Sequence, residues 1–195
     1  GEPLPEGLLE GAMAARGGAY YARSGALLPM LPASTRAPFA GRAAREGIMS
    51  ADAMVDLYSE VYADAAAEGD PQTHAATLRE AYLAAEPSAR IAAMQRLWAD
   101  GAKLGGGDGY GARVLTAYAA ARIPASEDQA DAAGDLIAAM LAAGLDANAG
   151  RWANVVEEGS LGWALIALAS PRGDEVGQGA VESFTGSDDS EGARK

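Results

Sequence analysis

Apolar residues recur along this chain with the spacing of amphipathic α-helices. Ile91, Met94 and Trp98 fall three or four positions apart, and so do the apolar residues between Ala133 and Leu141. Such spacing places side chains on one face of a helix. The pattern predicts helices over residues 5–23, 35–46, 51–68, 71–85, 87–100, 109–122, 127–143, 147–158 and 161–169.

Glycines follow the predicted helices, and polar residues precede them. A glycine suits the left-handed backbone just past a helix end, which predicts helix ends at Gly25, Gly47, Gly69, Gly101, Gly144 and Gly159. An aliphatic residue after two of them, Ile48 and Leu145, is typical of a Schellman motif. Capping side chains and first-turn prolines predict helix starts at Ser50, Asp70-Pro71, Glu86-Pro87, Ser126, Asp146 and Ser160.

Most connections between the predicted helices are two to six residues long, which favours neighbours that lie side by side and antiparallel. We therefore predict an all-α fold of stacked antiparallel helical hairpins, an α-solenoid-like array of about eight or nine short helices. Residues 24–34 contain two prolines and are expected to form a single apolar turn over the core. The tetratricopeptide signature does not occur at its required offsets.

Composition supports this fold. The chain has 48 alanines and two phenylalanines among 195 residues. Alanine has the highest helix propensity and a small side chain, so helices rich in it can pack closely. From residue 171 onward Gly, Ser and acidic residues dominate. We predict an alanine-rich helical domain over 1–170 and an acidic, Gly/Ser-rich tail over 171–195.

Charge and cysteine content exclude several function classes. The net charge of −12, without a basic cluster, argues against nucleic acid and against anionic membrane surfaces as partners. No run of apolar residues is long enough for a membrane span. The absence of cysteine removes thiolate nucleophiles and zinc–thiolate sites, and we predict no cofactor.

The compartment and the oligomeric state stay open, because a cysteine-free chain suits both the cytosol and a bacterial periplasm. Arginine outnumbers lysine by thirteen to two, which is typical of a GC-rich genome. We expect a bacterial protein. The chain begins Gly1-Glu2-Pro3, without the charged segment and apolar stretch of a signal peptide. We expect a fragment of a longer protein, with a trimmed export precursor as the alternative.

Acidic residues occur at strict four-residue steps within the predicted helix 51–68: Asp52, Asp56, Glu60, Asp64 and Glu68. Each step turns an α-helix by about 40°, so the five side chains share one side of it. The row is a candidate interaction surface or cation site. We favour a solvated helix face, because carboxylate metal sites in helical bundles normally include a Glu-x-x-His motif, which the chain lacks.

His74 is the only histidine, in line with Leu78, Ala81 and Tyr82 on the apolar side of its predicted helix. A single histidine excludes two-histidine metal motifs. A Ser-His-Asp arrangement remains formally open, but no Gly-x-Ser-x-Gly elbow supports one. We predict a buried or half-buried structural histidine, and neither a catalytic nor a metal-binding residue.

The glycine-rich run 105–111 precedes a predicted helix, as a phosphate-binding loop would. Such a loop needs Lys-Ser or Lys-Thr after its last glycine, whereas Lys103 stands before the run. We predict a linker, with Asp108 capping the next helix.

Aromatic residues at helical spacing are usually part of a core, and we expect this of Trp98, Trp152 and Trp163. Tyr20 and Tyr21 are adjacent and point about 100° apart on a helix, so one ring should face solvent as part of an interaction surface. The first fifty residues are also the most basic part of the chain, which could complement the acidic row internally or across a dimer. The basic residues are Arg16, Arg23, Arg36, Arg42 and Arg45.

Three functional hypotheses follow. The first is a non-catalytic helical scaffold that binds a protein or peptide in a groove between helices. The second is an accessory helical domain of a larger enzyme, such as one of the cell envelope, which requires exposed apolar area near a terminus. The third is a small hydrolase or lyase that uses carboxylates with His74, which requires an acid within reach of His74 in a pocket.

Overall fold

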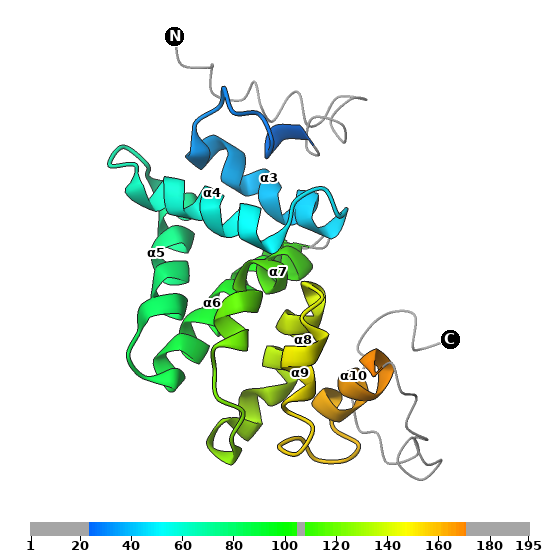
Figure 1. Cartoon of the computed structure of the whole chain (residues 1–195). Helices are drawn as coiled ribbons and strands as arrows, with labels where there is room; N and C mark the ends of the chain where they lie inside the picture. The colour runs from blue at the N-terminus through cyan, green and yellow to red at the C-terminus, as the bar shows by residue number, and fades with distance from the viewer. Residues whose placement is uncertain (1–23, 105–107, 171–195) are drawn as a thin grey trace. The chain divides into compact units, whose positions relative to one another are not determined.

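The computed structural model describes residues 24–104 and 108–170 (Figure 1). Within these ranges the regular structure is entirely helical, without strands, which confirms the all-α prediction. The chain divides into two compact units, Gly1–Thr116 and Ala117–Lys195. The predicted helix 5–23, the pair Tyr20-Tyr21 and the tail 171–195 lie outside the described residues.

The first unit contains the helices α3 (Ala33–Arg45), α4 (Ala51–Ala63), α5 (Gly69–Leu83), α6 (Pro87–Leu104) and α7 (Asp108–Ala121), the last up to Thr116. Helices adjacent in sequence pack together: α3 on α4, α4 on α5, and α5 on α6. Figure 1 shows α5 and α6 as an antiparallel hairpin, whereas α4 lies crosswise to α5. The predicted pairing of neighbours is present, and the solenoid-like array stays a prediction.

The second unit contains the 3₁₀ helix η1 (Glu127–Ala132) and the helices α8 (Ala133–Ala142), α9 (Asp146–Gly150) and α10 (Leu161–Ala169). Helix α8 contacts all three others. Its apolar face, Leu136, Ile137 and Met140, is fully buried, and so is Trp152. The core of this unit therefore forms around α8.

Small residues allow close helix packing in the first unit. Ala40, Ala43, Ala81 and Ala93 are fully buried. The closest approach joins α3 and α7, where a Cβ atom added to Gly111 would lie 2.3 Å from the Cα of Gly41. The two backbones touch at this point, and any side chain there would separate them.

Two helices end in the predicted Schellman motif. After α3, the Ile48 amide donates to Ala43 and the Gly47 amide to Ala44, with Gly47 at φ +71°. After α8 the same pattern recurs with Gly144 at φ +70°.

The predicted serine caps of α4 and α10 are also present. Ser50 Oγ accepts from the Ala53 amide and Ser160 Oγ from the Trp163 amide, each at 3.2 Å.

Several predicted boundaries are wrong. Helix α4 ends at Ala63 instead of residue 68, because Asp64 Oδ1 accepts from the Ala66 amide at 2.9 Å and turns the chain. Gly101 lies inside α6, and neither it nor Gly25 has the positive φ predicted for it. Asp70 lies inside α5, whose cap is Glu68.

Asp146 likewise is the first residue of α9, after the cap Leu145. The predicted helix 127–143 begins with six 3₁₀ residues, and Ser126 precedes them without a side-chain capping bond. The predicted helix 147–158 ends at Gly150. Beyond it, amides bond carbonyls three residues back, as Trp152 does to Ala149.

Within the described ranges, no helix combines the length and apolarity that crossing a bilayer requires.

Candidate functional site

The acidic row is divided between two helices. Asp52, Asp56 and Glu60 are exposed on α4, while Asp64 caps its C-terminus and Glu68 caps the N-terminus of α5. The prediction that all five acids share one helix face is therefore wrong, because α4 ends at Ala63, before Asp64 and Glu68. The role of the five acids as an interaction surface stays a prediction.

The expected pairing of early arginines with the row is present at Arg36 of α3, which forms an ion pair with Glu60 of α4. Arg42 instead pairs with Glu46 at 3.5 Å, at the end of its own helix. Arg16 and Arg23 lie outside the described residues.

A groove of about 420 Å³ runs between α4 and α5, and we call it the tyrosine groove. Its lining consists of Val55, Tyr58, Ser59, Tyr62 and Ala63 of α4, with Ala75, Leu78, Arg79, Tyr82 and Leu83 of α5. Tyr62 and Leu83 stand at its surface with exposed fractions of 42 % and 57 %, while Tyr58 and Leu78 are buried. The groove therefore has an apolar floor and an exposed apolar rim.

The rim also carries charge of both signs. The Arg79 guanidinium lies 5.0 Å from the centre of the Tyr62 ring, a cation–π contact that orients this ring. Asp52 and Asp56 lie three residues before Val55 and Ser59, so they flank the groove along its α4 edge. Acidic side chains therefore border an aromatic groove.

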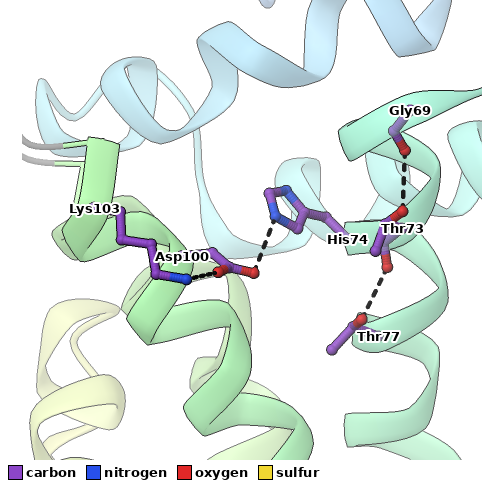
Figure 2. A network of polar contacts seen from close by, with 6 residues as sticks. All are labelled: Gly69, Thr73, His74, Thr77, Asp100 and Lys103. Carbon is purple, nitrogen blue, oxygen red and sulfur yellow. Dashed lines mark hydrogen bonds and ion pairs between the residues drawn. The ribbon is translucent and has the colours of Figure 1, made fainter.

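His74 faces a carboxylate across the α5–α6 hairpin. Its Nε2 lies 3.6 Å from Asp100 Oδ2, and Lys103 Nζ lies 2.9 Å from Asp100 Oδ1 (Figure 2). The Lys103 ammonium, with a smaller contribution from His74, holds the pKa of Asp100 below its ordinary value of 3.8. The His74 side chain is 24 % exposed, as predicted for a half-buried histidine.

The two threonine hydroxyls near this network donate to backbone carbonyls and not to His74 or Asp100. Thr73 donates to the Gly69 carbonyl at 3.1 Å and Thr77 to the Thr73 carbonyl at 2.9 Å, both within α5 (Figure 2). Neither hydroxyl is directed at His74. The acid that the hydrolase hypothesis requires is present, but this network supplies no nucleophile beside it.

His74 also lines a cleft of about 320 Å³ in the first unit, which we call the His74 cleft. All five helices contribute: Ala37, Pro38 and Gly41 of α3, Met54 and Tyr58 of α4, Asp70, Pro71 and His74 of α5, Leu97 and Gly101 of α6, and Gly111, Ala112 and Leu115 of α7. Asp70 and His74 are four residues apart and share one side of α5. The cleft has one polar wall and is otherwise apolar.

A hollow of about 580 Å³ in the second unit is lined partly by acids: Glu127, Asp131, Asp135 and Glu157. In the described part of the chain, no three His, Asp or Glu side chains are close enough together to hold a metal ion.

The tryptophans mostly follow the prediction. Trp98 and Trp152 are buried and Trp163 is half-buried. Trp98 Nε1 donates to Thr116 Oγ1 at 2.8 Å, and Arg113 covers its ring. Trp152 Nε1, by contrast, is buried without a hydrogen-bond partner among the described residues.

In the glycine-rich run, residues 105–107 lie outside the described residues. Helix α6 continues to Leu104 and α7 begins at Asp108.

Sequence reasoning missed the Asp100 partner of His74 and both hollows of the first unit. The sequence contains a weak signal for Asp100, because a helical hairpin with the connection 84–86 brings the start of α5 near the end of α6. It contains no signal for the two hollows, because each is lined by residues that are distant in the sequence.

No protein-family model, no curated protein and no solved structure matches this chain. Its function is therefore inferred from the arrangement of its own residues.

Proposed function

We propose that this protein is an interaction module that binds a basic, amphipathic peptide segment of a partner protein in the tyrosine groove. The tyrosine groove is the observation that carries the proposal. A helix laid into an apolar groove buries its own apolar face there, and aromatic side chains supply much of the binding energy in such contacts.

The length of the groove suits a short helix. Its lining on α5 runs from Ala75 to Leu83, about 12 Å along the helix axis, so about two turns of a partner helix can lie in it. Leu83 and Tyr62 offer apolar contacts at the rim, and Tyr58 and Leu78 form the floor.

Charge selects the kind of partner. Asp52 and Asp56 flank the α4 edge, and the whole chain carries a net charge of −12. A partner helix with lysines beside its apolar face is attracted to that edge, whereas one with glutamates is repelled. Arg79 is held over Tyr62 and so forms part of the aromatic surface.

The test uses fluorescence anisotropy with two labelled peptides of about 14 residues, one of leucine and lysine and one of leucine and glutamate, both with helical amphipathic spacing. We expect saturable binding of the lysine peptide only. Tyr62→Ala should weaken it about tenfold or more, as expected for the loss of an exposed aromatic side chain that the bound peptide covers.

The matched control is Tyr110→Ala, because Tyr110 is 43 % exposed against 42 % for Tyr62 and does not line the groove. Equal binding by both variants, or equal binding of both peptides, would contradict the proposal. Failure of the lysine peptide to bind at micromolar concentrations would do so as well.

A second candidate, the accessory domain of a larger enzyme, is favoured by α10. This helix is apolar all round, and Leu161 and Leu168 are 49 % and 86 % exposed. A helix of that kind is usually covered on most sides. If a further domain docks there, Leu168→Gln should reduce self-association of the chain in sedimentation, and Met30→Gln, 79 % exposed in the first unit, should not. A monomeric wild-type chain would argue against this candidate.

A further inference from the structure

We propose that the His74 cleft binds a small organic amine, with the ammonium group against Asp70 and the apolar body inside the cleft. This site shares only Tyr58 with the lining of the tyrosine groove.

The first argument is volume. The cleft opens to solvent and has a volume of about 320 Å³, which lies within the range of small-molecule sites. Small residues form much of the lining, including Gly41, Gly101 and Gly111, so few side chains project into the space. The remaining lining includes Met54, Leu97 and Leu115, which are buried. A hollow with such walls suits an apolar body.

The second argument is the polarity of one wall. Asp70 and His74 lie on the same side of α5, and both line the cleft. Nε2 of His74 lies 3.6 Å from Asp100 Oδ2, and Figure 2 shows Nδ1 directed away from Asp100. The Asp70 carboxylate only accepts hydrogen bonds, so this wall suits a ligand that donates.

The third argument is charge. Neither lysine nor arginine is among the described residues that line the cleft, and Lys103 is paired with Asp100 outside the lining. An anionic ligand would meet the Asp70 carboxylate without a counter-charge, whereas an ammonium group would form a charge-assisted hydrogen bond with it. Amines are thus favoured over alcohols, and alcohols over carboxylic acids.

The test compares three probes of similar shape: 2-phenylethylamine, 2-phenylethanol and phenylacetate. The full chain carries ¹³C-methyl methionine, and the Met54 methyl resonance is assigned with Met54→Leu. We expect the amine to shift the Met54 resonance saturably, the alcohol to do so more weakly, and the acid not at all. Met94 is fully buried and does not line the cleft, so its resonance should not move.

Variants identify the charged contact. Asp70→Asn should weaken amine binding about tenfold, the loss of one charge-assisted hydrogen bond. Asp128→Asn, which removes an exposed acid in the second unit, should leave it unchanged. His74→Gln should weaken binding less than Asp70→Asn does, and thermal unfolding of each variant verifies that it is folded.

Three outcomes would overturn the proposal: no movement of the Met54 resonance with any probe, equal affinity for amine and acid, or equal effects of the two aspartate substitutions. Tyr62→Ala distinguishes this site from the groove. It should weaken peptide binding about tenfold or more and leave amine binding intact, so either proposal can fail while the other stands.

Discussion

At the scale of single residues, the buried contact between α6 and α7 depends on one hydroxyl. Thr116 is fully buried, accepts the indole N–H of Trp98, and donates to the Ala112 carbonyl at 2.9 Å. Valine has nearly the same shape but cannot accept the indole hydrogen, so a buried donor would lose its partner.

Thr116→Val should therefore lower the free energy of unfolding by about 1–3 kcal/mol, measured by urea denaturation. Thr73→Val is the control, because Thr73 is exposed and its hydroxyl only bonds back within its helix. The control should change stability by less than about 0.5 kcal/mol. Equal losses in both variants would mean that the indole contact contributes nothing specific.

Asp100 provides a pH prediction whose sign follows from its partners. Its pKa is lowered in the folded protein, chiefly by the hydrogen bond from Lys103. The carboxylate form is thus favoured by folding, and the resulting stability is present above the ordinary pKa of 3.8. It is lost as the pH falls through the lower, folded pKa.

Lys103→Met should raise the pKa of Asp100 towards 3.8. The pKa is measured from the carboxyl ¹³C chemical shift of Asp100 in an NMR titration. Because this carboxylate is exposed, the effect on acid unfolding should be small, and the titration is the decisive readout. An Asp100 pKa that does not move in the variant would show that Lys103 is not its main partner.

Residue-level prediction succeeded where the cause was local. The half-buried state of His74 follows from its place on an apolar stripe, and the caps Ser50 and Ser160 follow from their neighbours. The contact between His74 and Asp100 spans 26 positions and depends on how α5 is set against α6, which apolar spacing leaves open.

At the scale of elements, the approach of α3 to α7 is the tightest constraint. The Cβ atom that Gly111→Ala adds would lie 2.3 Å from Gly41 Cα and 2.8 Å from its carbonyl oxygen. Because both atoms belong to the backbone, the strain cannot be relieved by a side-chain rotation.

Gly111→Ala should consequently lower the free energy of unfolding by about 2–4 kcal/mol. Gly109→Ala, two residues earlier in the same helix, is the matched control, because its Cβ would meet its nearest neighbours at 3.8 Å. That control should be neutral or stabilising by up to about 1 kcal/mol. Chemical denaturation measures both, and a tolerated Gly111→Ala would mean that the two helices can separate at little cost.

Helix ends were likewise predictable only where their cause is local in the sequence. The Schellman motifs at Gly47 and Gly144 were predictable, because a glycine followed by an aliphatic residue stabilises them. The end of α4 at Ala63 was not, because an alanine-rich continuation favours helix and only the side chain of Asp64 turns the chain. The 3₁₀ helix η1 before α8 was not predicted, because a single 3₁₀ turn is only weakly favoured by its local sequence.

At the scale of the whole molecule, composition identified the fold class but not the surfaces. Alanine content and sparse β-branched residues predict helices without specifying where space is left between them. Tyr58 illustrates this limit, because it lines both the tyrosine groove and the His74 cleft. Its place between two hollows results from the packing of α4 against its neighbours, which helical periodicity does not encode.

The net charge of the chain is a property of this scale, with 15 basic and 27 acidic residues. Acidic proteins attract basic partners over distances set by the Debye length, which falls from about 30 Å at 10 mM salt to about 3 Å at 1 M. Over that range, the association rate of the leucine–lysine peptide should fall by about tenfold or more, measured by stopped-flow fluorescence.

The dissociation rate of this peptide should depend on contacts in the tyrosine groove and not on the salt concentration. Tyr62→Ala removes a short-range contact, so it should speed dissociation and leave the salt dependence of association unchanged. Asp56→Asn, at the groove edge, should reduce that salt dependence and leave dissociation nearly unchanged. If both variants altered the same rate constant, the effects of long-range charge and of contacts in the tyrosine groove on binding could not be separated. The acidic edge could then not be the feature that selects a basic partner.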